Sequence, residues 1–173
     1  MRNSMSEVQY VQELETRFNG EVKLAGRYKG LSAPVLLQDQ YGVMCLSKAS
    51  TIFHGRPSIL IALNKTQYFM EMLKEAQPEI AKIVTPVGEY QAMKTKMLFD
   101  TQYGLVSVAP DSLLHGHKPT VRSACNRKDY MLKQLQEIYK DTDYQFKLDS
   151  VSRKEGKIIL ICPIHGEVLV DSD

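Results

Sequence analysis

The clearest metal-binding chemistry in this chain belongs to Cys162 and His165, which stand three positions apart in the run Ile-Cys-Pro-Ile-His-Gly. Thiolate sulfur and imidazole nitrogen are ligands that zinc prefers, and a structural zinc site needs four ligands. We expect no bound metal and no cofactor, and name Cys162 and His165 only as the weak candidates for one. Related segments upstream carry no Cys-His pair at the equivalent positions, which are Gln38, Tyr41, Asp100 and Tyr103.

Basic side chains form two recurring groups that suit phosphate binding, since Lys, Arg and helix amino ends are common phosphate contacts in protein–DNA complexes. Their recurrence predicts contacts to the DNA backbone in series. The first group lies on or beside the expected strands, mostly at the turn between the first two: Arg27, Lys29, Lys48, Lys94, Lys96, Arg153, Lys154 and Lys157. The second surrounds a glycine-to-proline break and the start of the next helix: Arg56, Lys65, His117, Lys118, Arg122, Arg127 and Lys128.

Asn64 and Asn126 recur at the same position of successive segments. An asparagine can read adenine through two hydrogen bonds in the major groove. It can equally cap or brace a helix through its own side-chain hydrogen bonds. Both interpretations are open from the sequence, and both residues belong to the expected nucleic-acid-binding set.

The sequence contains no complete catalytic motif. It has no His-Asn-His arrangement with metal spacing, no Gly-Ile-Tyr/Tyr-Ile-Gly pair, no phosphate-cradling glycine loop and no Gly-x-Ser-x-Gly elbow. Catalytic residues are therefore unassigned, and a nuclease is the one enzyme class we retain. Acidic residues stand at expected turns and caps, where short carboxylates satisfy backbone amides, as with Asp39, Asp100, Asp111 and Asp129.

These side chains are carried by a unit that returns after 62 residues. Tyr41-Gly42 recurs as Tyr103-Gly104 and, altered, as His165-Gly166. A fixed period of this size indicates one supersecondary unit used repeatedly. Further residues match at the same offset in the first two copies: Tyr28, Ser50, Pro57, Ala62, Asn64, Tyr68, Leu73 and Glu75 with Tyr90, Ser112, Pro119, Ala124, Asn126, Tyr130, Leu135 and Glu137.

Apolar runs and turn residues predict an α+β fold of tandem repeats, each a small three-stranded antiparallel sheet followed by a short and a longer helix. Expected strands cover 22–28, 34–37 and 43–46, then 89–94, 96–99 and 105–109, then 144–148, 157–162 and 167–170. The longer helices are expected from Pro57 to Glu75 and from Pro119 to Tyr139. The resulting organisation is an N-terminal helix at 1–20, repeat one at 21–78, repeat two at 79–140 and a sheet-only third repeat at 141–173.

The N-terminal helix should present one apolar face, because Val8, Val11, Leu14 and Phe18 follow at spacings of three and four. Asn19-Gly20 should end it.

Composition sets limits on location and partners. No stretch approaches the roughly 20 apolar residues that span a bilayer, and the polar start lacks the apolar run of a signal peptide. With three unevenly placed cysteines, this favours a cytoplasmic protein without a membrane partner. The net charge of +2, from 22 basic and 20 acidic residues, does not by itself indicate a polyanion partner.

The run DYMLKQLQEIYKDTDYQFKLDSVSRKEGKIILICPIHGEV, residues 129–168, resembles the repeated modules of many phage-encoded and bacterial proteins. YGVMCLSKASTIFHGRP and YGLVSVAPDSLLHGHKP are similar to the segment after the turn in those modules. The resemblance implies degenerate zinc-ribbon-like or treble-clef-like units, often attached to homing-endonuclease-type domains, and phage or mobile-element DNA biology. Metal-binding versions continue with Gly-Cys-Pro-x-Cys, which this chain lacks.

Together these features predict a duplex DNA-binding protein of phage or mobile-element origin. One alternative is a phage factor that binds and modulates a host protein, or that self-associates through the partial third repeat. A second alternative is a homing-type DNA endonuclease.

Overall fold

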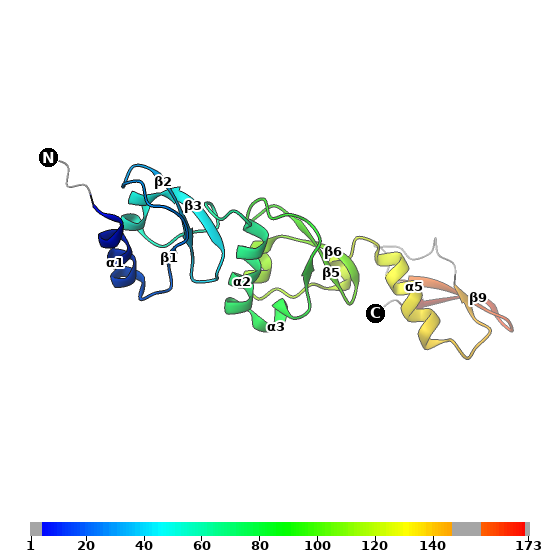
Figure 1. The fold of residues 1–173 in the computed structure, drawn as a ribbon. Coiled ribbons are helices and arrows are strands. Elements are labelled where there is room, and N and C mark those ends of the chain that lie inside the picture. The colour runs from blue at the N-terminus through cyan, green and yellow to red at the C-terminus, as the bar shows by residue number, and fades with distance from the viewer. Residues whose placement is uncertain (1–4, 147–156, 172–173) are drawn as a thin grey trace. The chain divides into compact units, whose positions relative to one another are not determined.

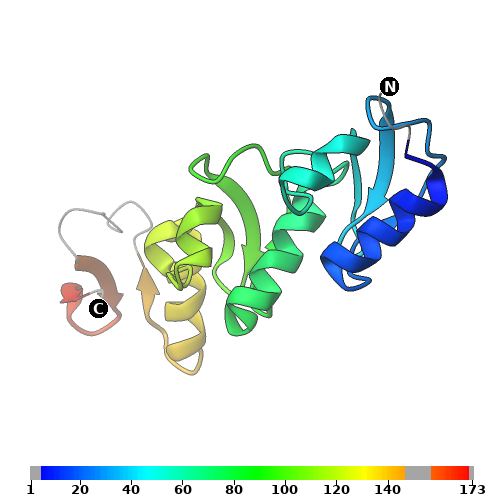
Figure 2. The same cartoon turned by 90° about the vertical axis from the view of Figure 1, so that its left-hand side faces the viewer.

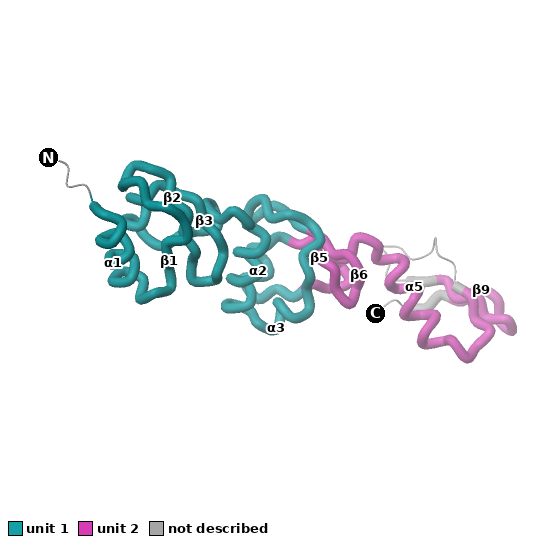
Figure 3. Tube along the Cα trace, viewed as in Figure 1, with its two compact units in different colours: residues 1–97, 109–118 teal, residues 98–108, 119–173 magenta. Residues whose placement is uncertain are grey.

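The fold is described from a computed structural model over residues 5–146 and 157–171 (Figure 1). Two compact units divide the chain, residues 1–97 with 109–118 and residues 98–108 with 119–173, and each is described by itself (Figure 3). None of the described helices is both long and apolar enough to cross a membrane. In chain order the elements are α1 (Glu7–Phe18), β1 (Lys23–Leu24), β2 (Pro34–Gln38), β3 (Met44–Lys48), η1 (Ala49–His54), α2 (Lys65–Ala76), α3 (Pro78–Ala81), β4 (Thr85–Pro86), β5 (Met97–Thr101), β6 (Gly104–Val108), α4 (Pro110–Leu114), η2 (Val121–Ser123), α5 (Arg127–Ile138), β7 (Gln145–Phe146), β8 (Lys157–Cys162) and β9 (Gly166–Asp171).

Three small antiparallel sheets recur along the chain, with strand orders β1-β2-β3, β4-β5-β6 and β7-β8-β9. The β2–β3 hairpin pairs Pro34 with Lys48 through Gln38 with Met44, and β8–β9 pairs Lys157 with Asp171 through Cys162 with Gly166. Helices follow the first two sheets, so the predicted α+β class with repeated sheet-plus-helix units is confirmed. The predicted boundaries at 20, 78 and 140 stay a prediction.

The first strand of each of the first two sheets is much shorter than predicted. Strand β1 has two residues where 22–28 was expected, and β4 lies at 85–86 instead of 89–94. In each copy a helix side chain accepts one backbone amide of the expected strand, beyond the residues that pair. Tyr28 N donates to Glu7 Oε2 at 3.3 Å, and Tyr90 N donates to Thr66 Oγ1 at 2.8 Å.

Helix α1 buries Leu14 and Phe18 of the predicted face, but not Val8 and Val11. Its buried residues are Tyr10, Leu14 and Phe18, whereas Val8 is 67% exposed and Val11 is 44% exposed. Tyr10 is buried on this face because its ring stacks on Tyr28, with ring centroids 4.6 Å apart. Because the spacing of four residues keeps Tyr10 in line with Leu14 and Phe18, the helix turns its valines outward.

The ends of α1 follow local chemistry. Ser6 and Gln9 form a capping box at its start. At its end Asn19 adopts the left-handed conformation with φ of 51°, and Gly20 follows with φ of 80°, so the predicted stop at Asn19-Gly20 is confirmed.

The longer helices begin later than predicted. Helix α2 starts at Lys65 instead of Pro57, and α5 starts at Arg127 instead of Pro119. The intervening segment extends the sheet: Leu46 N donates to Ile61 O, and Leu63 N donates to Met44 O. Ala124 likewise bridges to Val106, and Cys125 N donates to Leu105 O. These non-local backbone bonds hold residues 61–63 and 124–125 against the strands, ahead of the helices.

The helix before each sheet packs on the chain that follows it. Helix α1 stacks on Tyr28 and belongs to one core with Val35, Leu37 and Ile52. In α2, Phe69 stacks on Tyr90 at 5.8 Å. In both Figures 1 and 2, α5 lies beside β7, and its C-cap residue Tyr139 contacts Tyr144 at 5.6 Å. A preceding helix therefore recurs as a packing partner in the described copies.

After the Tyr-Gly turn, the offset between equivalent residues of the two complete copies changes from 62 to 61. Ser50 N donates to Leu31 O, and Asp111 N donates to Met93 O, both at 2.9 Å. Leu31 and Met93 are 62 residues apart, but Ser50 and Asp111 are 61 apart. Ser50 therefore corresponds to Asp111 rather than to Ser112.

Candidate nucleic-acid interface

The first basic group lies largely in the loops that precede the second strands. Arg27 and Lys29 stand in the loop between β1 and β2, and Lys94 and Lys96 stand in the loop before β5. All four side chains are exposed. Lys48, also exposed, ends β3. Among the described residues, none of these cations lies within 4.0 Å of an acidic side chain.

Three lysines on or beside the helices differ from those in the loops. Lys74, Lys82 and Lys140 each pair with a glutamate three residues earlier, at 2.7, 2.6 and 2.8 Å. Such pairs are exposed and individually weak, but they place a carboxylate beside each ammonium group. Within the part of the chain that the structure describes, the loop cations have no such carboxylate, so a phosphate would not have to compete with one.

The second basic group is less uniform. Arg56 pairs with Glu21, and Lys65 is the exposed first residue of α2. The charge of Lys118 contributes to lowering the pKa of Glu79, behind the larger effect of Lys82. Exposed side chains of this group are His117, Lys118, Arg122 and Lys128.

Arg127 departs from its neighbours at the start of α5. It is half-buried, and its Nε is buried without a hydrogen-bond partner among the described residues. Arg122, Arg127 and Lys128 belong to the second compact unit. Arg153 and Lys154 lie outside the described residues, and the side chain of Lys157 in β8 does as well.

Asn64 and Asn126 are helix caps. Asn64 Oδ1 accepts from Gln67 N at 2.9 Å, and Asn126 Oδ1 accepts from Asp129 N at 3.5 Å. The Asn126 amide also donates to the Asp129 carboxylate. Reading adenine would need the oxygen and the amide of one asparagine together. The capping interpretation is therefore the one that the geometry favours.

Cys162 and His165 face each other across the turn between β8 and β9. Cys162 Sγ lies 3.3 Å from His165 Nδ1. Backbone hydrogen bonds from His165 and Ile164 lower the pKa of the Cys162 thiol, and the His165 side chain adds to this. In the described part of the chain, no three His, Cys, Asp or Glu side chains are grouped to hold a metal ion.

Asp39 supports the first Tyr-Gly turn from inside. Its side chain is only 3% exposed, and Oδ1 accepts from Tyr41 N at 3.0 Å and from Val43 N at 2.8 Å. Burial raises the pKa of this carboxyl, and the backbone hydrogen bonds oppose the rise. The predicted turn role of Asp39 is confirmed. In the second copy Thr101 replaces it, and its Oγ1 accepts from Tyr103 N at 3.1 Å.

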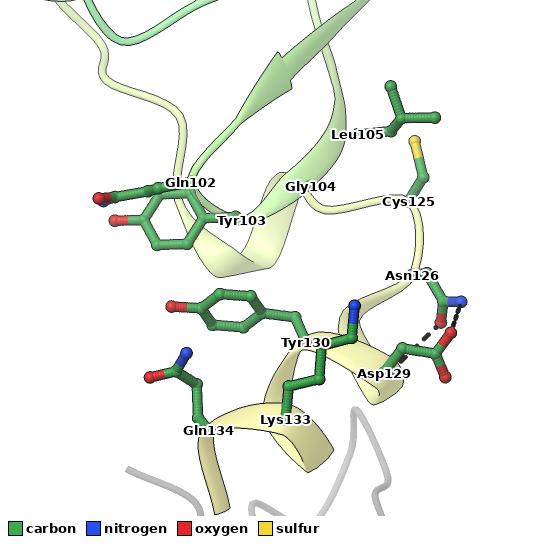
Figure 4. Close-up of a pocket in the computed structure, with 10 residues that line it drawn as sticks. All are labelled: Gln102, Tyr103, Gly104, Leu105, Cys125, Asn126, Asp129, Tyr130, Lys133 and Gln134. Atoms are coloured by element: carbon green, nitrogen blue, oxygen red, sulfur yellow. Dashed lines mark hydrogen bonds between the residues drawn. The ribbon is translucent and has the colours of Figure 1, made fainter. Parts of the chain in front are cut away.

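Sequence reasoning missed a pocket beside the second Tyr-Gly turn. It has a volume of about 350 Å³ and lies within the second compact unit (Figure 4). Tyr103 and Tyr130 line it edge to face, with ring centroids 5.3 Å apart at 74°. The available signal was the recurrence of both tyrosines, which match Tyr41 and Tyr68.

Comparison with known proteins finds no matching family model, no matching curated protein and no matching solved structure. The resemblance to phage and mobile-element modules stays a prediction.

Proposed function

We propose that this chain is a duplex DNA-binding protein whose basic loops contact phosphates in successive modules. The observation that supports this most is the contrast between cations. Among the described residues, the exposed loop residues Arg27, Lys29, Lys94 and Lys96 have no acidic partner, whereas three lysines on or beside helices, Lys74, Lys82 and Lys140, are each paired with a glutamate. Two copies of the unit repeat the arrangement at the same connection between strands.

The near-neutral net charge fits a local interface. With +2 overall, long-range attraction to DNA is small, so affinity would come from individual phosphate contacts. Each neutralised phosphate steepens the fall of log affinity with log salt by about 0.9. The number of contacts is therefore measurable from a salt series.

The test compares Lys94→Gln/Lys96→Gln with Lys74→Gln/Lys82→Gln, which removes the same charge from helix-associated lysines. Fluorescence anisotropy with a labelled duplex over a salt series should show a shallower slope, by up to about 1.8, for the loop variant only. Equal losses in the two variants would contradict loop contacts. Absence of duplex binding by the wild type at low salt would contradict the function.

We also propose a phage or mobile-element origin and action in the cytoplasm of a bacterial host. The support is the Ile-Cys-Pro-Ile-His-Gly sequence at residues 161–166, which runs from the end of β8 through the turn to the first residue of β9. Detecting the native protein in fractionated host cells would test the location, and recovery in the membrane fraction would contradict it.

Binding to a host protein is the second candidate, and the outward face of α1 favours it. Val8 and Val11 lie one turn apart and are both substantially exposed. Neighbouring exposed apolar residues mark protein contacts more often than scattered ones do. Capture of a host protein that is lost in Val8→Glu/Val11→Glu, while duplex affinity is unchanged, would support this candidate. Equal capture by both proteins would exclude this face.

A further inference from the structure

The two Tyr-Gly turns carry the same tyrosine pair in different states. In the first copy Tyr41 and Tyr68 meet edge to face at 5.2 Å and 86°. Tyr41 donates its hydroxyl proton to Glu75 at 2.5 Å, and Tyr68 donates to the Pro57 carbonyl at 3.0 Å. Both hydroxyls are therefore used inside the module.

In the second copy both hydroxyls are free of such bonds. Tyr103 and Tyr130 are half-buried, and their hydroxyls make no hydrogen bond among the described residues. Glu137, the counterpart of Glu75, pairs with Lys140 at 2.8 Å instead. The second copy thus presents two phenolic hydroxyls at its pocket, whereas the equivalent hydroxyls of the first copy are bonded inside the module.

Three other pocket positions change chemistry between the copies. At the same 62-residue offset, Glu71, Met72 and Leu63 of the first copy correspond to Lys133, Gln134 and Cys125. Glu71 pairs with Lys74, but Lys133 has no ion-pair partner in the described part of the chain. The other charged residue of the lining, Asp129, is bonded to the Asn126 amide. Lys133 is thus the uncommitted charge of the pocket.

The polar groups of the pocket are sorted by side. Figure 4 shows the two tyrosine hydroxyls with the amides of Gln102 and Gln134 on one side, and the Lys133 ammonium on the other, together with the bonded Asn126–Asp129 pair. A matching ligand has a flat apolar face, an edge rich in hydrogen-bonding groups and an anion at its opposite end. A nucleotide has these three features, and its base must be unpaired to present its edge.

We propose that this pocket binds one unpaired nucleotide of a DNA strand. The tyrosine rings form the aromatic wall for the base, the Gln102 and Gln134 amides and the hydroxyls contact its edge, and Lys133 contacts the phosphate. A volume of about 350 Å³ lies at the small end of ligand pockets, roughly 300–1,000 Å³, which fits one nucleotide rather than a duplex. This inference rests on the proposed DNA-binding function and names the strand state that the second copy recognises.

The test measures affinity for a labelled single-stranded oligonucleotide and for the duplex of the same sequence. Lys133→Glu restores the residue type of the first copy, and Tyr103→Leu removes one aromatic wall. Both should weaken single-strand binding, with about a fivefold or larger loss for Tyr103→Leu. Duplex affinity should stay close to wild type in both. Lys140→Glu makes the same charge change outside the pocket and should leave single-strand affinity unchanged.

Tyr103→Phe/Tyr130→Phe keeps both rings and removes only the hydroxyls, and it guards against misfolding of the leucine variant. It should also weaken single-strand binding, with a circular dichroism melt like that of wild type. Duplex binding without pocket-dependent single-strand binding would overturn the pocket and leave the proposed function standing. Pocket-dependent single-strand binding without duplex binding would do the reverse. Binding to neither would overturn both.

Discussion

The Tyr10 hydroxyl donates a hydrogen bond of 3.0 Å to the backbone carbonyl of Ala49, which joins the first helix to η1 across 39 residues of sequence. Both groups are buried, so neither has ready access to water. The ring of Tyr10 meanwhile stacks on Tyr28, whose own buried hydroxyl has no hydrogen-bond partner among the described residues.

Replacing these two tyrosines with phenylalanine should give opposite results. Tyr10→Phe leaves the Ala49 carbonyl unsatisfied and should lower the free energy of unfolding by about 1–3 kcal/mol. Tyr28→Phe removes an unpartnered hydroxyl and should be neutral or stabilising. Urea unfolding of both variants checks this. A matching loss in the two would show that the hydrogen bond contributes little beyond ring packing.

Asp39 should make stability fall as pH rises. Burial raises its folded-state pKa above the ordinary 3.8, so on raising the pH the unfolded chain ionises this group first. Its stabilising contribution is complete below the ordinary value and is lost as pH rises through the raised value. Asp39→Asn keeps a hydrogen-bond acceptor but does not titrate, so its stability relative to wild type should increase with pH.

Urea midpoints measured from about pH 3 to pH 7 give that difference. Asp39→Thr, the residue found at the equivalent Thr101, serves as the second non-titrating variant. A difference from wild type that is constant with pH in both would show that Asp39 has an ordinary pKa in the folded state.

Asn64 should matter to stability through its cap. Asn64→Ala should cost about 0.5–2 kcal/mol of unfolding free energy, whereas Asn64→Ser retains an acceptor for Gln67 N and should cost less. Duplex affinity of the serine variant should equal that of wild type. A loss of affinity in a normally stable Asn64→Ser protein would restore the adenine-reading interpretation.

Cys45 should resist alkylation while the protein is folded. Burial raises the pKa of its thiol to about 11, so the reactive thiolate is scarce near neutral pH, and the side chain is fully enclosed. Cys125 is exposed and provides the internal control. Mass spectrometry after a short iodoacetamide pulse should find Cys125 modified and Cys45 intact until urea is added. Equal labelling at both sites in the native protein would contradict the packing around Cys45.

Features that depend on residues adjacent in sequence, such as the Tyr-Gly turns and the end of α1, were predicted correctly. The Tyr-Gly turns formed as expected, with Gly42 and Gly104 at φ of 74° and 73°, and Asn19-Gly20 ended α1. The start at Pro57 was wrong because Ile61 and Leu63 bond to a strand some 15 to 19 residues earlier, which no local signal reveals. On α1, burial of Leu14 and Phe18 was predicted correctly, but Val8 and Val11 are exposed and the face is completed by Tyr10, which stacking buries.

The candidate site divided in the same way. Of the loop cations, only Lys29 was expected between strands, whereas Arg27, Lys94 and Lys96 were expected at strand ends and lie in loops because the strands are shorter than predicted. The pocket did not, since the contrast between Lys133 and Glu71 acquires meaning only when both are seen beside their tyrosine pairs. The offset of 62 was sufficient to align them, but it gave no sign of which side chains were already bonded.

The dependence of the first sheet on α1 has a consequence for dissecting the protein. The core that contains Tyr10, Leu14 and Phe18 also contains Val35, Leu37 and Ile52, so its members all fall between residues 10 and 52. A fragment starting at residue 21 would expose the apolar side of β2 and should aggregate when expressed alone. A fragment starting before Ser6 and ending after Gly55 retains that core. It is therefore the fragment to express for measuring what a single basic loop contributes.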